Sequence, residues 1–339
     1  LSGLVGSEMC IRDREEDLFH LLHECGTNMV RIRIWPDPYD EKGNSYGGGG
    51  NDLQTTIEIA RRTVECGMDF MLDFHYSDFW ADPAKQVKPK AWKELSGEAL
   101  ETAVYLHTVD TLKALKNHKL VPTMVQVGNE ITNGMLDIMP DRSKGETYKD
   151  TWGNAKNAKI LCGYLKAGIK AVRECTPKAL VTLHLESMGY GKCSEIMNAW
   201  EQNGVDYDVF GSSFYQFWQG NSSKNALAGL QKIENLAKSR GKMYAVMETS
   251  WLNSLKDADG TPNVIGEGHA NAKVYSDDPQ GQVDALTDMY QTLLSNDNGL
   301  GAFYWEGAWI PVKAGWTNWK YNKDCLLYTS DAADDMQCV

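Results

Sequence analysis

Two glutamates stand where a carboxylate can take part in catalysis. The segments 125–130 (VQVGNE) and 244–249 (YAVMET) are apolar runs, short enough for buried strands, that lead into Glu130 and Glu248. Apolar runs of this length normally stop at turn residues instead. Because parallel strands present catalytic groups at their C-terminal ends, the two carboxylates are expected to meet there. Two facing carboxylates are what glycoside hydrolysis requires.

Each glutamate also has a structural interpretation. Glu130 alone could be a solvated loop carboxylate, and Glu248 could cap the loop that follows its strand. The order of strands favours catalysis, because Glu130 ends the fourth strand and Glu248 the seventh when one strand is counted before Asp17. On a closed barrel those ends lie across the mouth, where a separation of about 5 Å would predict a nucleophile and retention of configuration.

Other polar side chains fall at the ends of the expected strands. Arg31 and Arg33 alternate within 30–35, so both point to one face, which is the interior of a barrel. Arg33, nearer the mouth, is expected to hold the nucleophile ionised, and a structural pair with another acid is the alternative. His75, within the polar and aromatic segment 73–83, is expected to bind a substrate hydroxyl or a catalytic glutamate, although a lone histidine is more often structural.

Aromatic residues recur at the same strand ends. Each aromatic residue taken alone is more safely assigned to the hydrophobic core. Their clustering at one face of the barrel, however, favours a sugar-binding surface, because the flat C–H faces of sugars pack on aromatic rings. These residues are Trp35, Trp80, Tyr215, Phe217, Trp218, Trp251, Trp305 and Trp309.

The acidic segment 257–263 (DADGTPN) is a candidate metal loop. Oxygen-bearing side chains occupy alternate positions, as in calcium loops, so Asp257, Asp259 and Asn263 are candidate calcium ligands. The segment lacks the twelfth-position glutamate of an EF-hand, and a solvated acidic turn is equally consistent with it.

Strands and helices alternate along the chain. This alternation predicts an α/β fold of parallel strands covered by helices, and eight such units close into a (β/α)8 TIM barrel. We expect this barrel to be truncated, since no first strand is visible before Asp17 and no convincing helix follows the last strand. A doubly wound open sheet is the alternative, but no Gly-rich phosphate loop follows the first visible strand. The candidate strands are 30–35, 70–76, 123–130, 180–186, 207–215, 243–249 and 301–306, and the candidate helices include 52–66, 97–116, 154–174, 226–240 and 279–295.

Composition narrows the class of partner. The 339 residues are 42% apolar, enough for a sizeable core, and the net charge of -12 argues against nucleic acid as a partner. No apolar stretch reaches the roughly 18 residues that a membrane span needs. Residues 1–16 and 325–339 fit neither helix nor strand patterns, so we expect a non-native leader and tail around a catalytic domain at 17–324.

The strings around these residues resemble glycoside hydrolase family 53, the arabinogalactan endo-β-1,4-galactanases. The resemblance runs from about Asp17 to Lys320 and rests most on the string from Leu72 to Pro83. Shorter strings support it: VRIRIW at 30–35, QVGNE at 126–130, FYQFW at 214–218, METS at 247–250 and FYWE at 303–306. The chain departs from the family in lacking the first-strand Gly-x-Asp-x-Ser string, and in Thr261, which replaces a calcium-binding histidine of some bacterial relatives.

The resemblance implies a barrel enzyme that hydrolyses β-1,4-galactan, the neutral side chain of pectin, with retention. It implies Glu130 as the acid and base and Glu248 as the nucleophile, and Trp305 as the platform under the sugar at the −1 subsite. The residues expected to bind substrate are Arg33, His75, Asp78, Trp80, Asn129, Tyr215, Trp218 and Trp305.

Two other interpretations remain open at this stage. One is another retaining barrel glycosidase, such as a mannanase or xylanase, and the other is a polysaccharide-binding fragment without turnover. A polymer substrate is too large to enter a cell, so we expect a secreted or periplasmic protein. We expect a monomer that binds neither nucleic acid nor membrane and requires no cofactor, with calcium as a possible structural ion.

Overall fold

The computed structural model describes residues 17–46, 50–219, 222–252 and 274–305. The expected leader at 1–16, the expected tail at 325–339 and the candidate calcium ligands Asp257, Asp259 and Asn263 lie outside the described residues. The described strands form one parallel sheet, in which each strand pairs with the next along the chain. The strands are β1 (Met29–Ile34), β2 (Asp69–Phe74), β3 (Met124–Val127), β4 (Leu180–Leu185), β5 (Val209–Ser213), β6 (Met243–Thr249) and β7 (Gly299–Tyr304).

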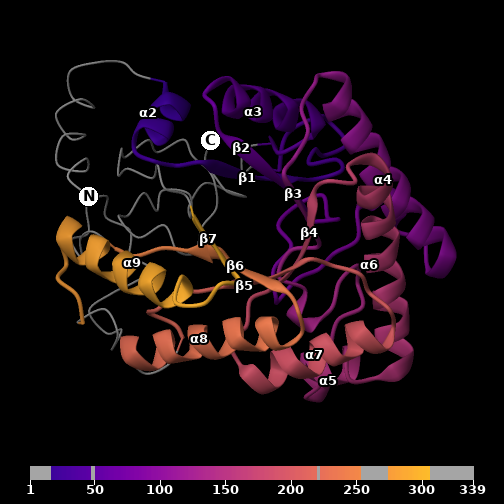
Figure 1. The fold of residues 1–339 in the computed structure, drawn as a ribbon. Coiled ribbons are helices and arrows are strands. Elements are labelled where there is room, and N and C mark those ends of the chain that lie inside the picture. The colour runs from indigo at the N-terminus through magenta and orange to yellow at the C-terminus, as the bar shows by residue number, and fades with distance from the viewer. Residues whose placement is uncertain (1–16, 47–49, 220–221, 253–273, 306–339) are drawn as a thin grey trace.

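Helices connect successive strands and lie outside the curled sheet (Figure 1). The α-helices are α2 (Leu18–Glu24), α3 (Leu53–Glu65), α4 (Gly97–Asn117), α5 (Tyr148–Thr151), α6 (Ala155–Cys175), α7 (Tyr190–Gln202), α8 (Ser223–Ser239) and α9 (Pro279–Leu293). Short 3-10 helices are η2 (Lys90–Trp92), η3 (Ile131–Asn133) and η4 (Arg142–Lys144).

This architecture confirms the predicted fold class. All seven predicted strands and the five named helices are present within a few residues of their expected bounds. The doubly wound alternative is wrong, because its strand order reverses at a switch point whereas here the order is sequential. No helix among the described residues is long and apolar enough to cross a membrane.

Local signals explain where the helices begin and end. The side chain of Asp52 accepts a hydrogen bond from the backbone N–H of Thr55 and so caps α3. After α2 and α3 the chain turns at Gly26 and Gly67, whose φ angles of 94° and 82° suit glycine. These turns return the chain to the base of the sheet, so that strands run in one direction and their C-terminal ends gather at one edge.

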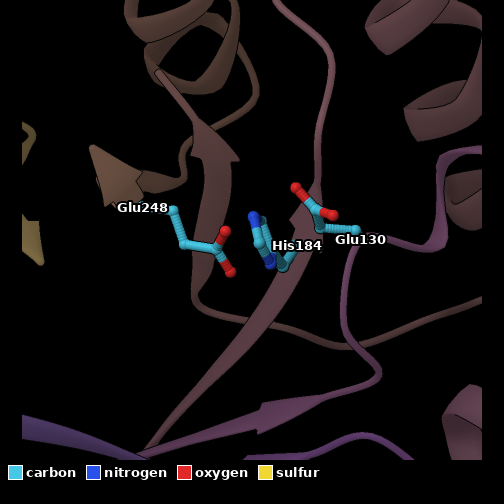
Figure 2. Close-up of side chains that lie close together, drawn as sticks. All are labelled: Glu130, His184 and Glu248. Atoms are coloured by element: carbon cyan, nitrogen blue, oxygen red, sulfur yellow. The ribbon is translucent and has the colours of Figure 1, made fainter. Parts of the chain in front are cut away.

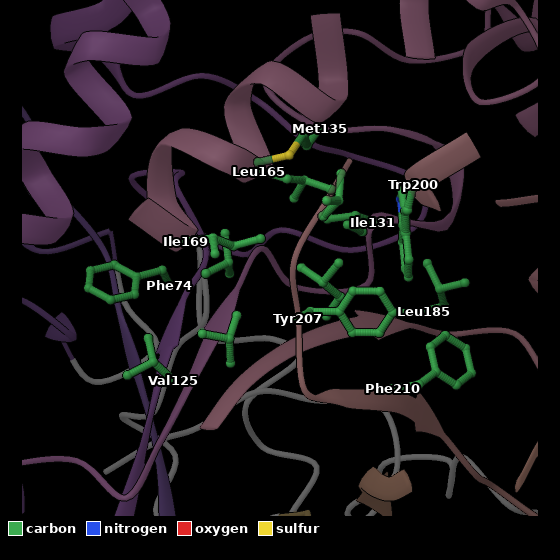
Figure 3. Packing of buried hydrophobic residues seen from close by; sticks show 14 of the residues in the cluster. Phe74, Val125, Ile131, Met135, Leu165, Ile169, Leu185, Trp200, Tyr207 and Phe210 are labelled. Carbon is green, nitrogen blue, oxygen red and sulfur yellow. The ribbon is translucent and has the colours of Figure 1, made fainter. Parts of the chain in front are cut away.

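The two faces of the sheet differ in chemistry. The outer face contributes apolar side chains such as Phe74 and Val125, which pack against helix residues such as Leu165 and Ile169 (Figure 3). The inner face holds a separate apolar cluster near the base, containing Met71, Met124, Val209, Ala245 and Met247. Above that cluster the inward positions become polar, and these polar positions build the site.

Candidate active site

A sharp backbone turn after β3 positions Glu130. Gly128 has a φ of 85°, and a Cβ there would lie 2.8 Å from the side chain of Ile131, so only glycine fits without rearrangement. Glu130 itself adopts a left-handed conformation with φ 47° and ψ 46°. Such strain costs on the order of 1 kcal/mol and persists only where surrounding contacts hold it. One such contact is the Gln86 side-chain amide, which donates to the carbonyl of Asn129 at 2.8 Å.

A register shift between β5 and β6 positions Glu248. Ser212 pairs with Val246, but the next residue, Ser213, pairs with Glu248. The irregularity places Ser213 and Glu248 side by side near the C-terminal ends of their strands. Both side chains are buried, so their orientation is set by packing and hydrogen bonds.

The two glutamates converge across the mouth of the sheet. Figure 2 shows the imidazole of His184, from β4, between the carboxylates of Glu130 and Glu248. One carboxylate oxygen of each glutamate and one ring nitrogen of His184 lie within 4.8 Å of one another. This spacing matches the roughly 5 Å of retaining glycosidases and is shorter than the roughly 6.5–9.5 Å of inverting ones.

Two donors bind the carboxylate of Glu248. Arg31 donates from Nη1 to Oε1 at 2.9 Å, and the hydroxyl of Tyr215 donates to Oε2 at 3.1 Å. Burial and the neighbouring charge of Glu248 raise the pKa of Tyr215 well above its usual range, so this phenol stays a donor. The carboxylate of Glu248 therefore accepts one hydrogen bond from a cation and one from a neutral hydroxyl.

The environment of Glu130 favours the neutral acid. Burial, and then the negative charge of Glu248, raise the pKa of Glu130 well above its ordinary value. The hydroxyl of Ser213 lies 2.6 Å from Oε1 of Glu130 and donates to it when the carboxylate is ionised, which opposes this effect in part. Glu130 thus has the environment of a general acid, and Glu248, which accepts from Arg31 and Tyr215, has that of a nucleophile.

The arginine that contacts Glu248 is Arg31, and the prediction that Arg33 does so is wrong. Arg31 also forms an ion pair with Asp73 at 2.8 Å and donates to Asn129 Oδ1 at 2.7 Å. Arg33, two residues further along, lies with its guanidinium carbon 4.2 Å from the ring centroid of Trp80 and 5.5 Å from that of Trp305. The guanidinium of Arg33 therefore packs against the rings of Trp80 and Trp305, which line the site.

His75 and Asp78 were expected to contact substrate, but neither lines the cavity. Both lie behind its wall. The ring Nδ1 of His75 lies 3.2 Å from the indole nitrogen of Trp35, and Nε2 lies 3.2 Å from Asp73. Asp78 accepts hydrogen bonds from the backbone N–H groups of Asp37 and Lys90. Both residues are buried and both hold loops in place.

The remaining predicted substrate-binding residues line a cavity of about 560 Å³ above the two glutamates. Trp80 and Trp305 meet edge to face, with ring centroids 5.8 Å apart, and Trp218 on the opposite side is 43% exposed. The described lining residues are Trp80, Ala81, Asp82, Pro83, Lys85, Asn129, Glu130, Glu186, Ser187, Met188, Ser213, Tyr215, Trp218, Gln219, Glu248 and Trp305.

The grouping of Glu130, His184 and Glu248 also has spacing that a metal ion would accept. However, the guanidinium of Arg31 lies 2.9 Å from Glu248 and already supplies a positive charge there. A second cation would be repelled, so we assign no metal to this group.

Several residues of the site were missed by sequence reasoning. Asp73, Gln126 and His184 are inward-facing polar residues within otherwise apolar strands, and Ser213 and Glu186 end neighbouring strands. The signal was present, because a polar residue in a buried strand requires a partner. Glu186 lines the cavity beside Glu130, whose pKa its negative charge helps to raise.

A curled sheet of parallel strands, with a buried and a partly buried carboxylate facing each other in an aromatic cavity at the strands' C-terminal ends, defines a glycoside hydrolase. The chain belongs to glycosyl hydrolase family 53, whose family model matches residues 10–333. The predicted family is thereby confirmed.

Characterised relatives agree with this assignment. The chain is 41% identical over 301 residues to the endo-β-1,4-galactanase of Bacillus subtilis, a match that covers 88% of this chain and 65% of that protein. It is 32% identical to the arabinogalactan endo-β-1,4-galactanase of Thermothelomyces thermophilus, covering 87% of this chain and 82% of that one.

Solved structures of the same family superpose well. The catalytic domain of a family 53 hydrolase from Ignisphaera aggregans aligns with a TM-score of 0.79 at 36% identity, covering 91% of this chain and 82% of that one. A fungal β-1,4-galactanase aligns with a TM-score of 0.73 at 28% identity, covering 91% of this chain and 87% of that one.

Proposed function

We propose that this protein is a retaining arabinogalactan endo-β-1,4-galactanase that hydrolyses the β-1,4-galactan side chains of pectin. The observation that carries the proposal is the convergence of Glu130 and Glu248 within 4.8 Å in contrasting environments. Membership of family 53 and the activity named for its relatives support galactan as the substrate.

The contrast between the glutamates supports the following roles. Glu248, bound by Arg31 and Tyr215, attacks the anomeric carbon and forms a covalent glycosyl ester. Glu130, held neutral by burial and by the charge of Glu248, gives its proton to the leaving glycosidic oxygen. Glu130 then removes a proton from water, which hydrolyses the ester and restores the starting configuration.

The cavity suits a neutral sugar chain. Three tryptophans, Trp80, Trp218 and Trp305, offer ring surfaces to its walls, while Asn129 and Glu186 offer polar atoms. The acidic carboxylates in the cavity would repel an anionic polymer such as the pectin backbone. We expect the enzyme to act outside the cell as a monomer, on a polymer that cannot enter it, without a required cofactor.

Product analysis on defined polymers tests this proposal. We expect the purified protein to release galacto-oligosaccharides from β-1,4-galactan, and nuclear magnetic resonance of early products to show the β-anomer first. E130Q and E248Q should each lower kcat by at least about 100-fold. Release from mannan or xylan but not from galactan would refute the substrate, and initial release of the α-anomer would refute the mechanism.

A further inference from the structure

A chain of three hydrogen bonds, two of them buried and one partly buried, lies behind Glu130. The hydroxyl of Ser213 lies 2.6 Å from Glu130 Oε1, and Nε2 of His184 lies 2.9 Å from the same hydroxyl oxygen. On the far side of the ring, Nδ1 of His184 lies 2.9 Å from Asn129 Oδ1. His184 is fully buried and Ser213 nearly so, so solvent does not satisfy either group.

The side-chain amide of Asn129 can adopt only one orientation. Its Nδ2 donates to the carbonyl of Ala81 at 2.8 Å. Its Oδ1 accepts from Arg31 at 2.7 Å and from Gln126 at 3.1 Å. Two atoms face Nδ1 of His184: the acceptor Asn129 Oδ1 at 2.9 Å and the donor Gln126 Nε2 at 3.4 Å. The nearer atom is the acceptor, so the geometry favours a hydrogen on Nδ1.

The state of His184 then decides which way the Ser213 hydroxyl points. Burial, and then the charge of Arg31, hold the pKa of His184 well below its ordinary value, so the ring is neutral and Nε2 is an acceptor. The single proton of the Ser213 hydroxyl can satisfy either Nε2 or the carboxylate of Glu130, but not both. Only a protonated Glu130, donating to Ser213, leaves every contact in the chain complete.

We propose that His184, acting through Ser213, is a positioning residue that retains the acid/base proton on Glu130 between turnovers. This inference rests on the proposed function, which makes Glu130 the acid/base. When Glu130 gives its proton to the leaving oxygen, the Ser213 hydroxyl turns from His184 to the new carboxylate and leaves Nε2 without a donor. When Glu130 takes a proton from water, the hydroxyl turns back and the chain is complete again.

The charges around the chain enter any pH measurement. Glu130 is also faced by Glu248 on β6, by Glu186 after β4 and by Asp82 after β2, and all three raise its pKa. The other titratable or charged groups near Glu130 or His184 are Arg31, Asp73, His75 and Tyr215. The variants H184Q, S213A and H107Q leave all these groups in place, so the contributions of these groups to the pKa of Glu130 are present in every variant compared.

The tautomer of His184 is a direct test that needs no catalysis. The full chain contains seven histidines and can be labelled with nitrogen-15 on the imidazole rings, with His184 assigned through bonds. We expect a neutral ring with hydrogen on Nδ1 from about pH 5 to 8. A hydrogen on Nε2, or an imidazolium ring within that range, would overturn the proposal.

The pH profile tests the effect on Glu130. In H184Q the amide nitrogen takes the place of Nε2 and donates to Ser213, which can then donate to an ionised Glu130. We expect the basic limb of kcat/KM on galactan to move about one pH unit lower, the size of one buried hydrogen bond. The double variant S213A/H184Q should have its basic limb at the same pH as the single variant S213A.

A matched control separates this role from a structural one. His107 on α4 is half-buried, and desolvation lowers its pKa to about 4, but it lies outside the cavity. H107Q should leave the basic limb in place. A fall of kcat in H184Q at every pH with no movement of the limb would refute the relay. Absence of galactan hydrolysis in the unmodified protein would refute the proposed function instead, and the tautomer measurement would still decide the state of His184.

Discussion

Replacing Arg31 with methionine is the sharpest test of how the site is held together. Methionine keeps the unbranched, flexible shape of the arginine stem but removes the charge and all its donors. In the native protein the guanidinium contacts Glu248 and Asp73 at 2.9 and 2.8 Å, and its side chain is only 7% exposed. R31M therefore leaves two buried carboxylates without their cation.

The expected loss follows from this burial. Removing one partner of a buried ion pair costs about 3–5 kcal/mol, because the other charge stays behind unpaired. For a protein of this size that corresponds to a fall of roughly 4–7 °C in melting temperature. Losing a donor that holds the nucleophile should also lower kcat/KM by about 100-fold or more.

The loss should depend on pH. Burial raises the pKa of Asp73, but the charge of Arg31 and the contacts with His75 together lower it more, so the pKa lies below the ordinary value. A lowered pKa contributes stability above the pKa of the unfolded side chain, about 4, and that contribution is lost as pH falls through the folded value. The deficit of R31M should therefore be largest at neutral pH and should narrow below about pH 4.

Scanning calorimetry and galactan hydrolysis on R31M and R61M make the comparison. Arg61 also contacts two carboxylates, those of Glu58 and Glu65, but its side chain is 47% exposed. Solvent screens exposed pairs, so R61M should melt close to the unmodified protein. Equal melting temperatures for R31M and R61M, or full activity in R31M, would refute the role given to Arg31.

Three further predictions concern the cavity and the metal loop. E186Q removes a negative charge that raises the pKa of Glu130, so the basic limb of kcat/KM should move to lower pH, whereas E24Q, on the exposed end of α2, should not move it. W218A should raise KM for galactan several-fold with little change in melting temperature, because its ring is 43% exposed, and a large fall in melting temperature would contradict this. Dialysis against a chelator should leave kcat unchanged, since the two-carboxylate reaction needs no metal. A melting temperature restored by calcium in the native protein but not in D259N would assign the ion to that loop.

Local patterns were sufficient to predict most of the fold. Short apolar runs marked the strands, because this signal acts within a few residues. Helices α2, α5 and α7 were not among the named predictions. Helix α7 lies against the sheet through large residues such as Trp200, so packing as well as local pattern defines it.

The composition of the site was only partly predictable. Glu130 and Glu248 were found because a carboxylate at the end of an apolar strand is unusual in itself. Arg31 and Arg33 share a face of β1, and sequence alone could not say which of them reaches Glu248. Which arginine reaches Glu248 depends on the register of β1 relative to the other strands, and that register exists only in the assembled sheet.

The sequence by itself determined the alternation of elements, the two catalytic candidates and the family, because each depends on residue types at short spacing. Tertiary structure alone decided which side chains meet. It placed His75 behind the wall, aligned Ser213 with Glu248 through a register shift, and set His184 between the glutamates. The physical reason is that hydrogen bonds and charge interactions act over a few ångströms, and those distances exist only once strands far apart in the chain lie side by side.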